Sequence, residues 1–351
     1  MNILIVGDQF IGGEAFQQAI ERQLGAGAGQ LRTVAWAGAD KQQQHAAQQV
    51  MEKEGPEAVP TPTEIVEAAG DAEVVAVHFA PISKAVLEAA PRLRAVVVAR
   101  AGYENVNVEE ASLRGVAVVN VLGRNAAAVA EHTLALLLGE LRDVARADAA
   151  IRAGGWPEQS DSPVYELGGR TVGLVGFGHV GRQVARRLVG FGVRLLVYDP
   201  YVDPDTVDAH GGTKTLDLAE VFRSSDVVSL HARLSDETRR FIGAEQLALM
   251  KPTAYFINTA RSRMVDYDAL YQALADRRIA GAALDVHEDE PLPPDSPWLR
   301  LPNVTLSPHV AGSTQDAWRK SVELVASAIR ELADGGRAAN TVNQPAQEGG
   351  P

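Results

Sequence analysis

Short apolar runs alternate with amphipathic helical stretches along most of the chain. Runs that are apolar throughout, rather than at every second position, are typical of strands buried on both faces, as in parallel sheets covered by helices. The pattern therefore predicts the α/β fold class, with doubly wound parallel sheets joined by right-handed crossovers. The expected strands are Ile3–Val6, Val74–Phe79, Ala95–Ala99, Val116–Val119, Thr171–Val175, Val193–Tyr198, Val227–Leu230, Ala254–Asn258, Ala280–Asp285 and Val304–Ser307.

Two longer helical patterns divide this succession of strands. The first runs from about Asn125 to Ile151, and the second begins near Thr314 and ends near Ala333. The strands between them make one complete nucleotide-binding unit, and the strands from Ile3 to Ala99 form a separate, smaller sheet. We expect the C-terminal helix to pack back onto the N-terminal domain.

Composition narrows the function. The 351 residues include 33 basic and 45 acidic side chains, which gives a net charge of −12 and argues against nucleic acid as a partner. The chain has no cysteine, which excludes disulfides, thiolate metal sites and cysteine nucleophiles. No apolar run is long enough to span a membrane, and the first residues resemble a buried strand more than a signal peptide. We expect a cytoplasmic protein with neither a membrane nor a nucleic-acid partner.

A glycine motif follows the strand Thr171–Val175. It reads Gly176-Phe177-Gly178-His179-Val180-Gly181 and is followed by a helical pattern, a second strand and Asp199. In such a motif the first glycine permits a tight turn, the second lets the backbone approach a pyrophosphate, and the third allows close helix–strand packing. The Asp199 carboxylate suits ribose hydroxyls and repels a 2′-phosphate. The motif therefore predicts NAD as the cofactor, unless the glycines merely shape a turn.

Polar residues at the carboxyl ends of later strands are the next candidates, because ligands of open α/β sheets gather there. They are His231, Arg261, Asp285, Glu290 and His309. Arg261 suits a substrate carboxylate, His309 can move a proton near neutral pH, and Glu290 can hold the other imidazole nitrogen. Taken singly, each could be an ordinary surface or core residue, and only their joint placement over a dinucleotide site favours catalysis. No His, Asp and Glu spacing indicates a metal site.

The N-terminal part should supply the rest of the substrate site. After the strand Ala95–Ala99 comes the loop Arg100-Ala101-Gly102-Tyr103, whose amides could hold the substrate carboxylate. The alternative is an ordinary turn between strand and helix. Arg100, Arg124 and Arg233 could add a second anion contact, which would permit a phosphorylated or polyhydroxylated acid. We expect His78 to be structural.

These motifs together resemble the D-isomer-specific 2-hydroxyacid dehydrogenase family, in its phosphoglycerate-dehydrogenase-like branch. The similar segments are RAVVVARAGYENVN, RGVAVVNVLGRNAAAVAEHT, GRTVGLVGFGHVG, YDPYV, VVSLHARLSDETRRFIG, INTARSRMVD, LDVHEDEPLP and LSPHVAGST. The family pattern usually has GVGxDNID where this chain has RAGYENVN, and LHxPLT where it has LHARLS. These departures concern the assignment of the substrate pocket, and the second places Arg233 near the cofactor.

The resemblance implies roles for individual residues. It implies that Arg261 binds the substrate carboxylate and that Glu290 and His309 are the acid–base pair. It also implies cofactor contacts from the glycine loop, Asp199, His231, Ala232, Thr259, Ala260, Asp285 and His309.

The resemblance also implies a domain arrangement and a homodimer through the NAD-binding domains. Residues 1–115 and 312–345 would form a flavodoxin-like substrate domain, residues 116–311 an NAD-binding Rossmann domain, and residues 346–351 a frayed tail.

The function that follows is an NAD-dependent oxidoreductase. It would transfer a hydride between nicotinamide and the second carbon of a 2-keto or D-2-hydroxy acid. The alternative is a dinucleotide-sensing binding protein that resembles the C-terminal-binding protein corepressors, which keep the same Arg, Glu and His set.

Overall fold

The computed structural model describes residues 1–25, 29–36, 40–158 and 164–343. The expected tail, residues 346–351, lies outside the described residues. The chain divides into two compact units, one made of residues 1–125 and 314–351 and the other of residues 126–313. The first is called unit 1 below and the second unit 2. Among the described residues, no helix is long and apolar enough to cross a bilayer.

Unit 1 is built on a five-stranded parallel sheet with the order β2-β1-β3-β4-β5. Its strands are β1 (Asn2–Gly7), β2 (Gln30–Ala35), β3 (Val74–Val77), β4 (Ala95–Val98) and β5 (Ala117–Asn120). Its helices are α1 (Gly13–Leu24), α2 (Lys41–Glu54), α3 (Thr63–Ala68), α4 (Lys84–Ala89), α5 (Val108–Leu113) and α13 (Gln315–Ala333), with a 3₁₀ turn at Pro56–Ala58.

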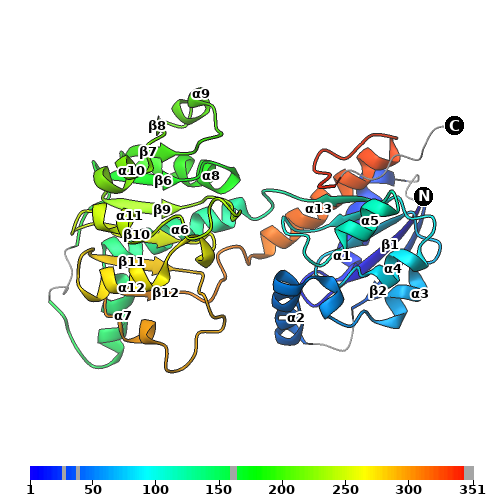
Figure 1. The fold of residues 1–351 in the computed structure, drawn as a ribbon, viewed down its shortest axis with the longest axis horizontal. Helices are drawn as coiled ribbons and strands as arrows, with labels where there is room; N and C mark the ends of the chain where they lie inside the picture. Colours follow the sequence, from blue (N-terminus) through cyan, green and yellow to red (C-terminus); the bar gives the residue numbers. More distant parts are fainter. Residues whose placement is uncertain (26–28, 37–39, 159–163, 344–351) are drawn as a thin grey trace. The chain divides into compact units, whose positions relative to one another are not determined.

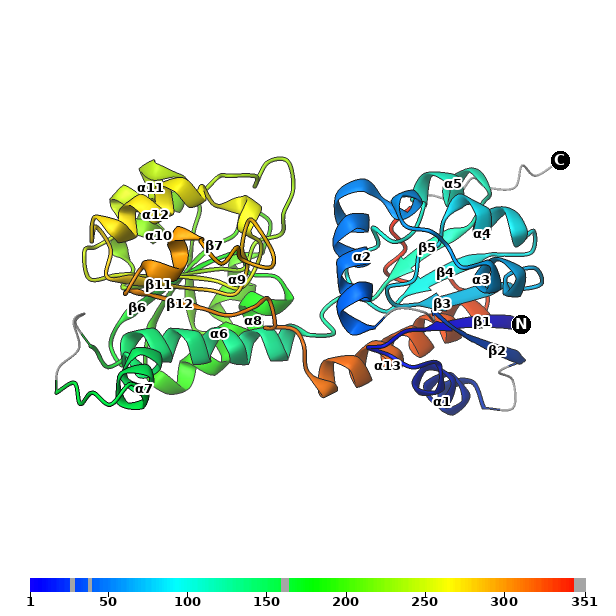
Figure 2. The same ribbon diagram turned by 90° about the horizontal axis from the view of Figure 1, so that it is seen from below.

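The strands of unit 1 are covered on both faces, as their apolar sequences require. Alternate residues of β1 face opposite sides: Ile3 and Ile5 pack with α1 and α13, whereas Leu4 and Val6 pack with the other helices. Figure 2 shows α1 and α13 together below the sheet and α2 to α5 above it. The C-terminal helix therefore packs on the N-terminal domain, as expected.

Unit 2 is built on a seven-stranded parallel sheet with the order β12-β11-β10-β9-β6-β7-β8 (Figure 1). Its strands are β6 (Thr171–Val175), β7 (Arg194–Tyr198), β8 (Gly212–Thr215), β9 (Val227–Leu230), β10 (Tyr255–Asn258), β11 (Gly281–Leu284) and β12 (Val304–Leu306). Its helices are α6 (Ala126–Leu141), α7 (Val144–Arg152), α8 (His179–Leu188), α9 (Pro204–Asp208), α10 (Leu218–Ser224), α11 (Ala244–Leu249) and α12 (Tyr267–Ala275). Three 3₁₀ turns lie at Val189–Phe191, Ser262–Met264 and Pro297–Arg300.

Both sheets are doubly wound, which confirms the expected fold class. The order in unit 2 reverses between β6 and β9, and the order in unit 1 reverses between β1 and β3. Each reversal opens a place at the carboxyl ends of the strands where neighbouring connections run to opposite faces of the sheet. These two switch points position the residues described below.

The structure differs from the sequence analysis in three details. The division between units falls after Asn125 rather than before Val116, because β5 pairs with β4 in the first sheet. The helical pattern from Asn125 to Ile151 is two helices, since Asp143 adopts a left-handed backbone with φ of 57° between α6 and α7. The sequence analysis also missed β2 and β8, which are the edge strands next to β1 and β7.

Candidate active site

The glycine motif forms the turn from β6 into α8, at the switch point of unit 2. Gly176 has φ of 101°, and a Cβ there would lie 2.4 Å from the backbone nitrogen of Ala232. A Cβ on Gly181 would lie 2.4 Å from the carbonyl oxygen of Gly176. Both positions therefore need glycine for close backbone packing. A Cβ on Gly178 would meet no atom within 4 Å, so this glycine leaves open space beside the helix.

That open space lies at the N-terminus of α8, where the first amides have no partner within the helix. His179 and Val180 are the first two residues of α8, and Gly178 is its N-cap without a capping side chain. Backbone amides and the helix dipole favour an anion at this position. The arrangement fits the pyrophosphate of a dinucleotide, which the amides of Gly178, His179 and Val180 would hold.

Asp199 directly follows β7, the second strand of the motif, and its carboxylate binds the glycine loop. Its Oδ2 accepts the amide of Phe177 at 2.8 Å, and its Oδ1 accepts the amides of Tyr201 and Val202 at 2.9 and 3.1 Å. Asp199 is only half-buried, so its carboxylate also remains accessible from outside. A carboxylate at the end of this strand suits ribose hydroxyls and disfavours a phosphate.

The remaining cofactor candidates follow β9 and β10. Burial lowers the pKa of His231 to about 3, so its imidazole is neutral at pH 7. Its Nε2 lies 2.9 Å from Oγ of Ser229. Oγ1 of Thr259 lies 2.8 Å from Oγ1 of Thr133 on α6, and the amide of Ala260 donates to Asn258 at 3.0 Å. These contacts order the edge of the sheet beside the glycine loop.

His309 and Glu290 are in direct contact. Nδ1 of His309 lies 2.8 Å from Oε2 of Glu290, and Oε1 of Glu290 accepts the amide of His287 at 2.9 Å. Burial alone would raise the pKa of Glu290, but the hydrogen bond and charge of His309 outweigh it and lower that pKa. Glu290 is therefore a carboxylate at neutral pH. The side chain of His309 is 35% exposed, so Nε2 is the nitrogen left for a substrate.

Asp285 holds the loop that carries His309. This loop is unusual, because His309 has φ of 55°. Asp285 accepts the amides of Val310 and Ala311 at 3.0 and 2.9 Å, and it accepts the hydroxyl of Ser307 at 2.6 Å. Burial would raise the pKa of Asp285, but these bonds and His132 lower it to about 2. We expected Asp285 to contact the cofactor, and its observed contacts are to the His309 loop.

Three further residues of this network, His132, Ser307 and His287, were missed from the sequence. His132 on α6 places Nε2 at 3.1 Å from Oγ of Ser307, and Ser307 bonds Asp285. His287 places Nε2 at 2.9 Å from the carbonyl oxygen of Ser307. The position of Ser307 directly after β12 is a signal that could have identified it. His132 lies in the middle of a helix and shows no comparable signal.

Arg261 follows β10, which neighbours β11, so it lies at the same edge of the sheet as Asp285. Its side chain is exposed, and its Nη1 donates to the carbonyl oxygen of Ala260 at 2.8 Å. Within the described part of the chain, no ion pair involves Arg261, and no hydrogen bond joins it to Glu290 or His309. Its guanidinium therefore retains donors for an anion.

In unit 1, the loop after β4 contains Arg100, Ala101, Gly102 and Tyr103. Arg100 is 6% exposed, and its Nη2 donates to Glu52 at 3.0 Å and to Glu104 at 2.8 Å. Its Nη1 is buried and has no hydrogen-bond partner among the described residues. The Ala101 carbonyl accepts the Asn120 amide, and Tyr103 packs against the core. Arg100 is therefore largely neutralised within its own unit.

The switch point of unit 1 holds a buried pair that sequence reasoning missed. Asp8 follows β1 and His78 follows β3, and Oδ2 of Asp8 lies 3.0 Å from Nδ1 of His78. Both side chains are fully buried. Burial lowers the pKa of His78 to about 4, although Asp8 opposes the shift. Asp8 could have been found by listing polar residues after strands in the first sheet as well as in the second.

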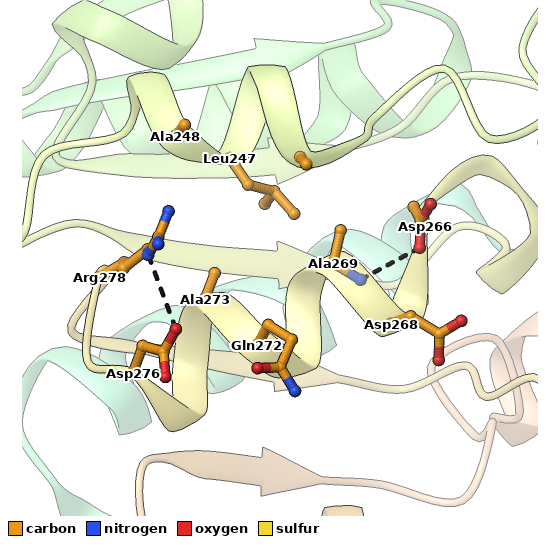
Figure 3. A pocket seen from close by; sticks show the side chains of 10 residues that line it. Leu247, Ala248, Asp266, Asp268, Ala269, Gln272, Ala273, Asp276 and Arg278 are labelled. Atoms are coloured by element: carbon orange, nitrogen blue, oxygen red, sulfur yellow. Dashed lines mark hydrogen bonds and ion pairs between the residues drawn. The ribbon is translucent and has the colours of Figure 1, made fainter.

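Two surface pockets lie elsewhere. The larger one, of about 490 Å³, lies between α11 and α12 and is lined by Leu247, Asp266, Gln272 and Arg278 among others (Figure 3). A smaller one, of about 250 Å³, is lined by residues between Tyr267 and Trp298. Neither contains the glycine loop or His309. No cluster of three or more His, Asp or Glu side chains that could hold a metal ion occurs among the described residues.

A dinucleotide loop and a His–Glu pair on one doubly wound sheet define the class of protein as a dinucleotide-dependent oxidoreductase. Comparison with known proteins agrees. The model of the D-isomer specific 2-hydroxyacid dehydrogenase NAD-binding domain matches residues 134–311. The chain belongs to this family, and it is an NAD-dependent D-2-hydroxyacid dehydrogenase.

Individual relatives are consistent with that assignment. The chain is 41% identical over 293 residues to glyoxylate reductase from Korarchaeum cryptofilum, a match that covers 82% of this chain and 88% of that protein. It is 37% identical to D-3-phosphoglycerate dehydrogenase from Methanocaldococcus jannaschii over 81% of this chain, but only 54% of that protein.

The solved structures share the fold. The NAD-complexed D-isomer specific 2-hydroxyacid dehydrogenase from Lactobacillus delbrueckii ssp. bulgaricus is similar with a TM-score of 0.78 and 24% identity, over 97% of this chain and 100% of that one. The relatives named here are enzymes, and none of them favours the dinucleotide-sensing alternative.

Proposed function

We propose that the enzyme interconverts a small 2-keto acid and its D-2-hydroxy acid, with His309 as general acid and base. The hydrogen bond of 2.8 Å between His309 and Glu290 carries this proposal. Since Glu290 occupies Nδ1, the proton that reaches the substrate oxygen moves at Nε2. The Glu290 carboxylate stabilises the imidazolium whenever His309 is protonated, and it holds the ring in one orientation. A dinucleotide held at the glycine loop would supply the hydride acceptor as NAD and the hydride donor as NADH.

Arg261 is proposed to bind the carboxylate next to the reacting carbon. Its planar guanidinium can donate two parallel hydrogen bonds to a carboxylate. Its exposure and its lack of an ion pair among the described residues support that role. The loop of Arg100, Ala101, Gly102 and Tyr103 is proposed to contribute further substrate contacts from unit 1.

The substrate proposed is a short 2-keto acid. The relatives are named for glyoxylate, D-3-phosphoglycerate and hydroxypyruvate. Glyoxylate and hydroxypyruvate, with and without a phosphate, are therefore the first compounds to assay. Turnover of none of them, nor of any other 2-keto acid, would favour the dinucleotide-sensing alternative.

Asp199 is proposed to set the preference for NAD over NADP. A carboxylate that faces a phosphate should cost about 2 kcal/mol or more, which corresponds to roughly twentyfold or more in affinity. The ratio of kcat/KM for NADH and NADPH measures this preference. A ratio below about twentyfold would count against the role of Asp199.

We also propose a cytoplasmic homodimer that forms through the NAD-binding unit. Helix α7 has no buried residue, and Ile151 and Trp156 are 52% and 80% exposed. A second copy of the chain would cover such side chains. Light scattering that gives the mass of one chain would exclude the dimer. Fractionation that finds the enzyme outside the cytoplasm would exclude the location.

His309→Ala tests the central role. Loss of positioned acid–base catalysis should lower kcat by about 10²- to 10⁴-fold and leave the Kd for NADH nearly unchanged. Stopped-flow or steady-state turnover gives kcat, and NADH fluorescence titration gives the Kd. The matched control is His45→Gln, because His45 is an exposed histidine on α2. This variant should behave like the wild type. Undiminished turnover by the His309→Ala variant would overturn the proposal.

A further inference from the structure

Ser307, which directly follows β12, contacts both loops that carry the proposed acid–base pair. Its hydroxyl donates to Oδ1 of Asp285 at 2.6 Å. Its carbonyl oxygen accepts Nε2 of His287 at 2.9 Å and the amide of His309 at 3.1 Å. The amide of His287 in turn donates to Glu290 at 2.9 Å. Ser307 therefore joins the loop of His309 to the loop of Glu290.

The hydroxyl of Ser307 has a single proton, and the carboxylate of Asp285 determines where that proton lies. Asp285 is fully buried and also accepts the amides of Val310 and Ala311. Burial would raise the pKa of Asp285, but hydrogen bonds from His132, Ser307 and the two amides lower it to about 2. The group is thus a carboxylate, which can only accept. Nε2 of His132 lies 3.1 Å from the Ser307 oxygen, so it must be the donor and must carry a proton.

His132 connects this network to a helix rather than to another loop. Its Nε2 also lies 3.5 Å from Oδ1 of Asp285. Helix α6, which carries His132, packs its buried residues Ala130, Leu137 and Leu141 into the core of unit 2. A side chain on a packed helix holds its position more precisely than one on a loop. His132 is therefore a fixed point for the Ser307 hydroxyl.

The loop held by this network has an unusual backbone at His309. Its φ of 55° is a left-handed conformation, which a residue other than glycine keeps only where its surroundings impose it. Ser307 before it and Val310 and Ala311 after it all donate to Asp285. A catalytic group displaced by about 1 Å can lose about 10²-fold in rate. The network is thus placed to control the position of the imidazole.

We propose that Ser307 and His132 are positioning residues for the acid–base pair of the dehydrogenase. Through Asp285 they hold the His309 loop in the backbone conformation that brings the imidazole to Glu290. The hydrogen bonds run in one direction, from Nε2–H of His132 to the Ser307 hydroxyl and from that hydroxyl to Asp285. Neither positioning residue transfers a proton to the substrate. The inference rests on the proposed function, since it concerns the acid–base pair of that reaction.

Variants of Ser307 test the role of its hydroxyl. With hydroxypyruvate or glyoxylate and NADH, Ser307→Ala should lower kcat by about 10-fold or more and change the Kd for NADH by less than about 3-fold. Ser307→Thr keeps a hydroxyl on the same carbon and should recover most of the lost kcat. Ser224→Ala is the matched control, because Ser224 is an exposed serine at the end of α10 in the same unit. It should leave kcat and the Kd unchanged.

Variants of His132 test the second positioning residue. His132→Ala should lower kcat by about 3- to 10-fold, and His132→Gln, whose amide can donate from a similar place, should recover part of it. The double variant Ser307→Ala/His132→Ala should lower kcat little more than Ser307→Ala alone, because the two side chains act through one hydrogen-bonded group. Losses that multiply would show that they act separately and would overturn the inference. The His132 variants also decide the matter if a Ser307 variant does not fold.

A spectroscopic measurement tests the direction of the hydrogen bonds without turnover. In enzyme labelled with ¹⁵N at histidine, two-bond ¹⁵N–¹H correlation spectra distinguish a protonated ring nitrogen from an unprotonated one. The signals of His132 are assigned by their loss in His132→Gln. At pH 8 its Nε2 should be protonated in the wild type. An unprotonated Nε2 would overturn the inference.

The kinetic results separate this inference from the proposed function. Full kcat in Ser307→Ala, or a loss that a folded Ser307→Thr does not recover, would overturn the inference and leave the dehydrogenase function intact. Loss of NADH affinity with kcat retained would mean that Ser307 serves the cofactor, which also contradicts the inference. Absence of all 2-keto acid turnover by the wild type would overturn the proposed function, and the positioning role with it.

Discussion

The two switch points have the same topology and opposite contents. In unit 2 the turn after β6 presents glycine backbone and open space next to Gly178. In unit 1 the turn after β1 is filled, because Asp8 accepts the amides of Phe10 and Ile11 at 2.8 Å each. These amides lie just before α1, where a phosphate would otherwise bind. A carboxylate of the chain itself occupies the anion position in unit 1.

The neighbouring strands at the two switch points, β3 in unit 1 and β9 in unit 2, share one feature but differ in its surroundings. Each is followed directly by a histidine, His78 after β3 and His231 after β9, and burial lowers the pKa of both. His78 is held by Asp8 and stacks on Phe79 with ring centroids 3.8 Å apart. The same doubly wound topology therefore serves a dinucleotide in one unit and a closed polar core in the other. Loop residues rather than strand order decide which.

The largest expected effect is a loss of stability when Asp8, which fills the switch point of unit 1, is replaced. Asp8→Ala removes the acceptor of three backbone amides and of His78, all of them buried or partly buried. The free energy of unfolding of unit 1 should fall by roughly 3–5 kcal/mol. Urea denaturation followed by tryptophan fluorescence measures the loss, and NADH affinity should be unchanged wherever the protein is folded.

Asp71→Ala is the control for that prediction, because Asp71 is an exposed residue of the same unit. It should change stability by about 0.5 kcal/mol or less. A loss of NADH affinity in Asp8→Ala, with stability retained, would break the comparison. It would mean that the first switch point serves the cofactor after all.

The next effect is the dependence of stability on pH. The folded pKa of His78, about 4, lies below its unfolded value of about 6.5, so the unfolded state takes up the proton first as pH falls. Stability is therefore greatest above pH 6.5 and is lost progressively towards pH 4. From pH 7 to pH 5, His78 alone should cost about 2 kcal/mol. Asp8 stays ionised in this window, because its pKa is lowered by His78 despite its burial.

Urea titrations at pH 7, 6 and 5 measure that slope. His78→Gln should make the slope shallower by the His78 contribution, even if the variant is less stable at pH 7, while the lowered pKa of His231 maintains the remainder. A wild type whose unfolding free energy is constant from pH 7 to pH 5 would contradict the neutral, buried state of His78.

The smallest expected effect is on NADH affinity, and it tests the open switch point of unit 2. Gly178→Ala adds a Cβ into open space, so its unfolding free energy should change little. The same Cβ stands where a pyrophosphate would approach, and NADH affinity should fall by about tenfold or more. Gly190→Ala, which also meets no atom within 4 Å, is the matched control and should bind NADH normally. Normal NADH binding by the Gly178→Ala variant would contradict the placement of the pyrophosphate at this loop.

The sequence predicted the interior of the fold better than its edges. The expected strands are present with ends shifted by no more than two residues, because most of their residues are apolar and most are buried. The missed strands β2 and β8 are edge strands with mixed, partly exposed side chains, whereas the edge strands β5 and β12 were predicted. The break between α6 and α7 was missed because apolar periodicity continues across Asp143 while its backbone turns.

The candidate site divides in a similar way. The glycine motif, Asp199, His309 and Glu290 could be selected by their positions after strands, and His309 and Glu290 are in contact as expected. The hydrogen-bonded group formed by Asp285, Ser307 and His132 could not be predicted. It joins residues from β11, β12 and α6, and nothing in the sequence states which side chain of a helix faces which loop.

What the local order of residues determined by itself was the series of buried strands, the glycine turn and the kinds of side chain that end each strand. Those properties depend on neighbours in the chain, through steric limits on the backbone and through burial of apolar runs. Only the tertiary structure decided that Asp8 fills one switch point, that Asp285 supports the His309 loop, and that Arg124 lies on Trp318. Each of these is a long-range contact, and its energy depends on the distance and burial that packing alone creates.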